Sequence, residues 1–134
     1  MDLERSIESI MTSDVEVVSP SQALVDVKHI YEKEPFHHHI PVVEDGKLIG
    51  VLSLIDFMRH IHYASMDDNE VIYTESKVSE IMVSNPTTIA PSTSVREAVQ
   101  ILSQGHIHSL LIAENGELKG IVTTADLMKL MLQS

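Results

Sequence analysis

Cysteine is absent from this chain of 134 residues, which excludes disulfides, thiolate metal sites and cysteine nucleophiles. The chain also has no apolar run of the roughly eighteen residues that a membrane-spanning helix needs. Its first ten residues, MDLERSIESI, are acidic and amphipathic, whereas a signal peptide has a basic stretch followed by an apolar one. These absences favour a cytoplasmic protein with no membrane segment.

Basic residues are scarce, with 9 Lys and Arg against 20 Asp and Glu and a net charge of −11. A nucleic-acid surface needs clustered Lys and Arg, so nucleic acid is not an expected partner, and the charge favours solubility. The hydrophobic fraction of 43% predicts a folded chain with a core rather than a disordered one.

An internal repeat organises the sequence. Four residue pairs recur at a spacing of 70: Gly46 with Gly116, Gly50 with Gly120, Ser53 with Thr123, and Asp56 with Asp126. Further upstream the spacing is 71, and it matches Met11 with Met82, Pro20 with Pro91, and Ile30 with Ile101. The first copy therefore carries one extra residue, which we place in the HHH run, where the second copy reads HIHS.

Each copy predicts the same order of elements. A short β segment (15–20 and 86–91) precedes a helix (21–34 and 92–105), with Ser92 or Ser94 as a candidate N-cap and Gly105 as a C-terminal stop. Two strands follow, joined by EDGK in the first copy and ENGE in the second, both hairpin signals. A second helix (54–64 and 124–134) closes each copy. We expect a first domain at 1–64, a polar linker at 65–77 and a second domain at 78–134.

The motif Gly-x-x-[Ser/Thr]-x-x-Asp occurs twice, as GVLSLID and GIVTTAD. Around it stand IMTSDVEVVSP and IMVSNPTTIAP, then FHHHIPVVEDG and HIHSLLIAENG. With these motifs, essentially the whole chain resembles a tandem pair of cystathionine-β-synthase (CBS) domains, a Bateman module. The resemblance implies an α/β fold in which each repeat has a three-stranded sheet and two helices, packed about a pseudo-two-fold axis.

The resemblance also implies a regulatory module that binds AMP, ADP, ATP or S-adenosylmethionine in two clefts between the repeats. The motif Asp would hold the ribose hydroxyls, and the Ser or Thr would lie near ribose or phosphate. Carried over by position, one cleft comprises Ser53, Asp56, Asn85, Thr87, Ile107 and His108. The other comprises Thr123, Asp126, Val15, Glu16, His37 and His38.

The chemistry of the motif suits this role, because an ionised Asp can accept hydrogen bonds from two vicinal hydroxyls. The same residues also suit a purely structural role, since Ser, Thr and Asp are favoured at helix starts. Glu16 and the nearby Asp14 would add negative charge to the Asp126 cleft. We therefore expect AMP-like ligands to bind more tightly at the Asp56 cleft.

The eight histidines do not predict a metal site. In an extended strand His37 and His39 point to one side and His38 to the other, so the run cannot offer three ligands to one metal. No nucleophile–base pair, glycine-rich phosphate loop or zinc motif appears, which argues against an enzyme. We expect no required cofactor, a homodimer and an effector protein on another chain. The alternative is a ligand-free dimerisation or scaffold module.

Overall fold

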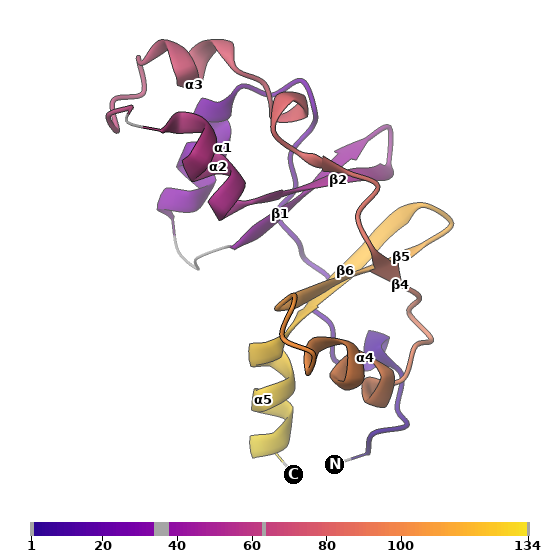
Figure 1. Cartoon of the computed structure of the whole chain (residues 1–134). Helices are drawn as coiled ribbons and strands as arrows, with labels where there is room; N and C mark the ends of the chain where they lie inside the picture. Colours follow the sequence, from indigo (N-terminus) through magenta and orange to yellow (C-terminus); the bar gives the residue numbers. More distant parts are fainter. Residues whose placement is uncertain (1, 34–37, 63, 134) are drawn as a thin grey trace. The chain divides into compact units, whose positions relative to one another are not determined.

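The computed structural model describes residues 2–33, 38–62 and 64–133. The chain forms two compact units, shown in Figure 1. Unit 1 consists of Met1–Val15 together with Thr87–Ser134, and unit 2 is Glu16–Pro86. Each unit therefore contains most of one repeat, and unit 1 also takes up the first residues of the chain.

Both units have the α/β composition expected from the sequence, with a three-stranded sheet in each. Unit 2 contains, in chain order, α1 (Leu24–Glu32), β1 (His39–Glu44), β2 (Lys47–Ser53), α2 (Leu54–Ile61), α3 (Val71–Glu75), the 3-10 turn η2 (Val78–Glu80) and β3 (Val83–Ser84). Unit 1 contains the 3-10 turn η1 (Ile7–Ser9), β4 (Thr88–Ile89), α4 (Val95–Leu102), β5 (Ser109–Glu114), β6 (Glu117–Thr123) and α5 (Thr124–Leu132).

The two predicted hairpins are confirmed. Asp45 and Gly46 have φ values of 51° and 79°, and Asn115 and Gly116 have φ values of 54° and 79°. Positive φ at both central residues matches the twist of the flanking strands and explains the Asp-Gly and Asn-Gly sequences. Both antiparallel ladders also shift register at equivalent places, Val42/Val43 and Ile112/Ala113.

Each sheet is extended by a segment that belongs to the start of the other repeat. In unit 2, β3 pairs with β2 through Val83 and Val51, whereas in unit 1 Thr12 forms the corresponding bridge to Ile121. The first fifteen residues of the chain thus do for unit 1 what residues 72–86 do for unit 2. The repeat indicated a hairpin and one further strand per copy, but not this exchanged position.

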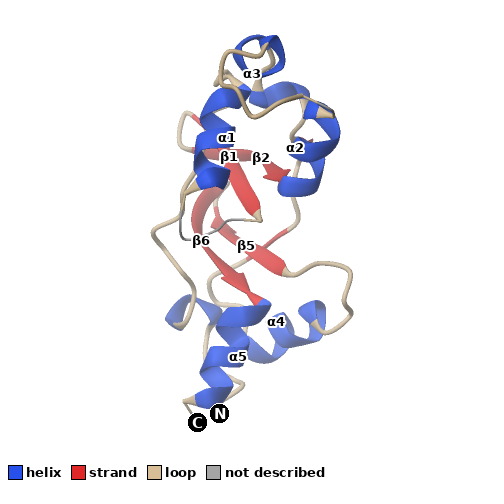
Figure 2. Ribbon diagram, turned by 90° about the vertical axis from the view of Figure 1, so that its left-hand side faces the viewer, coloured by secondary structure: helices blue, strands red, loops and turns tan. Residues whose placement is uncertain are grey.

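Helices cover the sheets and close the two cores, as Figure 2 shows for α4 and α5 beside the β5–β6 hairpin. In unit 2 the buried core residues are Val18, Leu24, Val27, Ile30, Tyr31, Ile40, Val42, Leu52, Phe57, Tyr73 and Val78. In unit 1 they are Ile7, Val95, Ala98, Leu102, Leu110, Ile112, Val122 and Leu127. Of the two N-cap candidates, Ser94 is the cap, since its side chain accepts a hydrogen bond from Glu97 N at 3.1 Å.

The segment 65–77 is more ordered than its polar composition indicates. It contains α3, and its Tyr73 side chain is 0% exposed. The Tyr73 and Phe57 rings lie 6.4 Å apart, and Phe57 lies 5.2 Å from the Tyr31 ring. The segment is therefore packed into unit 2. Its mainly polar composition did not predict this packing, because burial of the single Tyr73 ring is enough to attach the segment. The domain boundaries expected from the repeat stay a prediction.

Among the described helices, none has the length and apolar character needed to cross a membrane. The cytoplasmic location stays a prediction.

Candidate functional site

The motif Ser and Thr lie at helix N-termini in equivalent positions. Ser53 is the N-cap of α2, and its hydroxyl accepts a hydrogen bond from Asp56 N at 3.0 Å. Thr123 is the N-cap of α5, and its hydroxyl accepts a hydrogen bond from Asp126 N at 3.1 Å. Each cap satisfies one of the amide groups that a helix start leaves without a partner.

The motif Asp residues, both half-buried, differ between the two units. In α5 the Asp126 carboxylate accepts a hydrogen bond from Thr123 N at 2.9 Å, which completes a capping box. Among the described hydrogen bonds of α2, only the serine half of that arrangement is present. One carboxylate oxygen of Asp126 is thus already engaged by its own helix start.

The residue that precedes each hairpin lies next to the helix start of its own unit. The carbonyl of His38 accepts a hydrogen bond from Leu54 N at 2.9 Å, and that of His108 accepts one from Thr124 N at 3.0 Å. Both histidines are exposed. A histidine, a hydroxyl residue and an Asp therefore gather at one helix N-terminus in each unit, a setting that favours anionic and hydroxyl-bearing groups.

The motif glycines make room for a neighbouring chain segment. A Cβ built on Gly50 would lie 2.8 Å from Met82 Sδ and 2.9 Å from the Val83 carbonyl oxygen. On Gly120 it would lie 2.6 Å from Met11 Sδ and 2.7 Å from the Thr12 carbonyl oxygen. The Ile-Met segments that open each repeat thus pass directly over these glycines. This close approach requires glycine at both positions, whether or not a ligand binds.

The predicted site residues divide between the units. Unit 2 holds Ser53, Asp56, Asn85, Glu16, His37 and His38, and unit 1 holds Thr123, Asp126, Val15, Thr87, Ile107 and His108. His37 lies outside the described residues. Within its own unit each Asp lies near the residue that precedes the first hairpin strand, His38 for Asp56 and His108 for Asp126. The sequence comparison of the repeats did not indicate this proximity. The expected pairings across units, such as Asp56 with His108, stay predictions.

Two of the remaining residues have informative backbone or charge environments. Asn85 is exposed and has a φ of 55°, a conformation that Asn tolerates better than most residues. Glu16 forms an ion pair with Lys33, at 3.1 Å between Oε1 and Nζ. The negative charge that the sequence assigned to Glu16 is therefore partly compensated by a cation of its own unit.

Burial raises the pKa of the Tyr31 hydroxyl well above its ordinary value, and the charge of Asp56 raises it further. The Tyr31 hydroxyl donates to the Leu52 carbonyl at 3.4 Å. Asp56 therefore lies close enough to the core of unit 2 to affect a buried neighbour, and Tyr31 stays uncharged at neutral pH.

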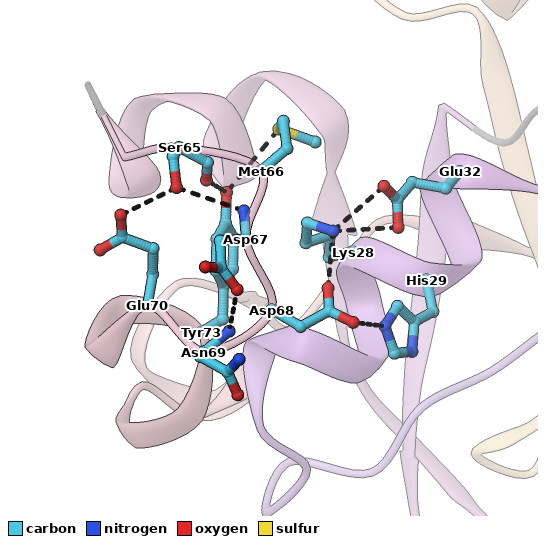
Figure 3. Close-up of polar contacts among 10 residues, drawn as sticks. All are labelled: Lys28, His29, Glu32, Ser65, Met66, Asp67, Asp68, Asn69, Glu70 and Tyr73. Carbon is cyan, nitrogen blue, oxygen red and sulfur yellow. Dashed lines mark hydrogen bonds and ion pairs between the residues drawn. The ribbon is translucent and has the colours of Figure 1, made fainter.

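A cluster of polar side chains that the sequence did not indicate joins α1 to the segment 65–70 (Figure 3). Lys28 Nζ lies 2.7 Å from Asp68 Oδ1 and 3.1 Å from Glu32 Oε2, and His29 Nε2 lies 2.8 Å from Asp68 Oδ2. Ligand atoms of His29, Glu32 and Asp68 lie within 4.8 Å of one another, the one metal-ligand arrangement among the described residues. The Lys28 ammonium bonds to both carboxylates, so these side chains form an ion-pair network. The absence of a metal site stays a prediction.

A family comparison accounts for the doubled helix-start arrangement. A sequence model described as the CBS domain matches residues 7–63 and again residues 78–133. The chain belongs to the CBS domain family. Because the match occurs twice, the protein is a tandem pair of CBS domains, a Bateman module, as the motifs indicated.

Individual relatives agree. The CBS domain-containing protein YhcV of Bacillus subtilis is 30% identical over 122 residues, which cover 91% of this chain and 82% of YhcV. MJ1225 of Methanocaldococcus jannaschii is 27% identical over 96% of this chain, and its crystal structure matches with a TM-score of 0.83 over 98% of this chain and 49% of MJ1225. The structure of CBSX2 in complex with AMP matches with a TM-score of 0.80 at 24% identity, over 96% of this chain and 97% of CBSX2. The chain spans 48% and 41% of the Methanocaldococcus relatives MJ1225 and MJ1232.

Proposed function

We propose that this CBS pair is a non-catalytic regulatory module that binds an adenosine-containing ligand such as AMP, ADP, ATP or S-adenosylmethionine. The observation that carries the proposal is the doubled helix start, where a capping hydroxyl and an Asp stand beside the start of a strand in each unit. The AMP complex of the structural relative CBSX2 supports adenosine as the ligand class.

The chemistry assigns a role to each group. The Asp56 and Asp126 carboxylates accept hydrogen bonds from vicinal ribose hydroxyls. The first-turn amides of α2 and α5 suit an anionic phosphate, and the exposed residues His38 and His108 lie next to these helix starts. Occupancy would then shift the populations of module conformations, which an effector protein on another chain would sense.

The ranking of the two helix starts remains part of the proposal, but its main reason changes. Lys33 offsets the charge of Glu16, so repulsion by that carboxylate is weaker than the sequence indicated. The capping box instead engages Asp126, whose carboxylate would have to divide its acceptors between Thr123 N and ribose. Asp56 should therefore be the stronger ribose acceptor.

Calorimetric titration with AMP tests this proposal. We expect the native chain to bind AMP, and Asp56→Ala to lose more affinity than Asp126→Ala. The double variant should not bind. Loss of one pair of charge-assisted hydrogen bonds should lower the affinity about tenfold or more. Glu75→Gln, an exposed acid-to-amide change on α3, is the control. Greater dependence on Asp126 would contradict the ranking.

The alternative of a ligand-free scaffold has one observation in its favour. Both capping hydroxyls and the Asp126 carboxylate already satisfy backbone amides of their own helices, so the motif has a structural use without a ligand. A thermal shift panel of AMP, ADP, ATP and S-adenosylmethionine separates the two functions, because a ligand that binds the native state raises the melting temperature. No shift with any of the four would favour the scaffold.

A further inference from the structure

Tyr73 fills the space between α1 and α2 in unit 2. Its side chain is 0% exposed, its ring centre lies 6.4 Å from that of Phe57 on α2, and Lys28 Nζ of α1 lies 5.6 Å from its ring centre. The Tyr73 hydroxyl donates to the Ser65 carbonyl at 2.8 Å, so the residue anchors the whole loop (Figure 3). A short helical segment thus docks on this helix pair through one aromatic side chain.

A carboxylate completes that docking. Lys28 is 3% exposed, and a buried ammonium needs an acceptor to offset its desolvation. Asp68 supplies one at 2.7 Å from Lys28 Nζ, and Glu32 supplies the second. The docked segment therefore carries two features that match its seat, an aromatic ring for the apolar gap and an acid for the lysine.

Unit 1 has an open groove at the equivalent place. The groove has a volume of about 430 Å³ and lies between α4 and α5, with an apolar lining formed by Leu3, Val99, Leu102, Ser103, Thr124, Leu127, Met128 and Met131. The repeat spacing of 71 aligns Lys28 with Val99, and the spacing of 70 aligns Phe57 with Leu127. The two residues that contact Tyr73 in unit 2 therefore correspond to two residues that line the groove in unit 1.

The chain path explains why unit 1 keeps this groove. The bridge between Ala23 and Lys77 in unit 2 corresponds to the bridge between Ser94 and Ser6 in unit 1. Counting back along both segments places Asp2 at the position of Tyr73. Asp2 is exposed, and an acid is a poor occupant for an apolar groove.

We propose that the α4–α5 groove of unit 1 is a docking site for a short helical segment of another polypeptide that presents an aromatic anchor. In unit 2 the equivalent helix pair, α1 and α2, binds such a segment through the aromatic ring of Tyr73. The charge pattern adds a restriction, because Val99 stands where unit 2 has Lys28. The occupant therefore presents an apolar side chain, not a carboxylate, at the place that Asp68 takes in unit 2. This inference does not depend on adenosine binding.

Synthetic fluorescent peptides test the site directly. The probes are a peptide with the sequence of residues 65–77, its Asp68→Leu version, and an Asp68→Leu version that also carries Tyr73→Ala, each titrated with the full chain by fluorescence anisotropy. We expect the Asp68→Leu peptide to bind about tenfold more tightly than the unchanged peptide, since an unpaired carboxylate against apolar side chains is costly. The Tyr73→Ala version should not bind.

Variants of the protein locate the binding. Met128→Glu at the groove should abolish peptide binding, whereas Met58→Glu, the equivalent change on α2, should not; both side chains are more than half exposed, at 60% and 57%. Val99→Lys should reverse the peptide preference and favour the sequence that keeps Asp68. Equal loss in both methionine variants, no binding by any peptide, or an unchanged preference in Val99→Lys would overturn the proposal. So would sedimentation showing that Met128→Glu dissociates a dimer whose monomer binds no peptide.

Discussion

Gly50 and Gly120 show how one missing Cβ determines a contact between distant parts of the chain. The carbonyl oxygens of Val83 and Thr12 would lie 2.9 and 2.7 Å from a Cβ at these positions. Backbone atoms cannot move aside as a flexible side chain can, so the clash would push an edge segment away from its sheet. The glycine of the CBS motif is thus needed for the close approach of a neighbouring segment.

We expect Gly120→Ala to lower the free energy of unfolding by about 1–3 kcal/mol, the range typical of overpacked sites. Urea denaturation measures this directly. Adding Met11→Ala should recover only part of the loss, because that change removes the sulfur contact and leaves the Thr12 carbonyl in place. An unchanged midpoint in Gly120→Ala would contradict the close approach.

The structure of the segment 65–77, which contains α3, was the hardest to predict from amino-acid composition. Its residues 65–70 are exposed and two of its anchors are long-range, the Asp68–Lys28 ion pair and the buried Tyr73 ring. Hydrogen bonds with Lys28 and His29 lower the pKa of Asp68. The hydrogen bonds that Lys28 donates to Asp68 and Glu32 raise the pKa of Lys28 despite the opposing effect of burial. The attachment of α3 should therefore respond to pH.

The direction follows from the lowered pKa of Asp68. An acid whose folded pKa lies below its unfolded value stabilises the fold above about pH 4, and this contribution is lost as pH falls through the folded pKa. Asp68→Asn should therefore lower the melting temperature at pH 7, and its difference from the native chain should shrink below about pH 4. Glu75→Gln is the matched exposed control. A difference that stays constant down to pH 2 would contradict the role of the ion pair.

For the whole molecule, apolar side chains stand exposed on the closing helices of both units. Ile55 of α2 is 61% exposed and Leu132 of α5 is 87% exposed. Exposed apolar surface of this kind favours self-association, most often as a symmetric dimer. The homodimer remains a prediction.

We expect sedimentation at micromolar concentration to show a dimer, and the combined Ile55→Glu and Leu132→Glu variant to sediment as a monomer with an unchanged circular dichroism spectrum. Both side chains are exposed, so the charges should not disturb either core. A native chain that is monomeric throughout this range would refute self-association through the closing helices.

Metal removal tests a second property of the whole chain. The chain has no thiolates, and the Lys28 ammonium bonds to both carboxylates of the His29, Glu32 and Asp68 group. We therefore expect treatment with EDTA to leave the melting temperature unchanged. A fall that occurs in the native chain but not in Asp68→Asn would instead place a structural metal at this group.

Local patterns alone determined much of this protein. The hairpins could be predicted because Asp-Gly and Asn-Gly favour the positive φ values that these turns require. The N-cap of the helix in the second copy could be predicted to be one of two serines, Ser92 or Ser94. The doubled motif identified the CBS pair because both copies keep the same residues at the same spacing. Each of these features depends on residues close together in the chain.

The tertiary structure decided what depends on distant contacts. The polar composition of residues 65–77 predicted a linker, but burial of Tyr73 between two helices orders this segment. Lys28 and Asp68, forty positions apart in the sequence, form an ion pair that adds to the attachment. The first residues of the chain complete unit 1 because their backbone can pair at the edge of β6, a contact that no local pattern encodes. The same path leaves the α4–α5 groove open, since it places Asp2, and not an aromatic residue, at the equivalent position.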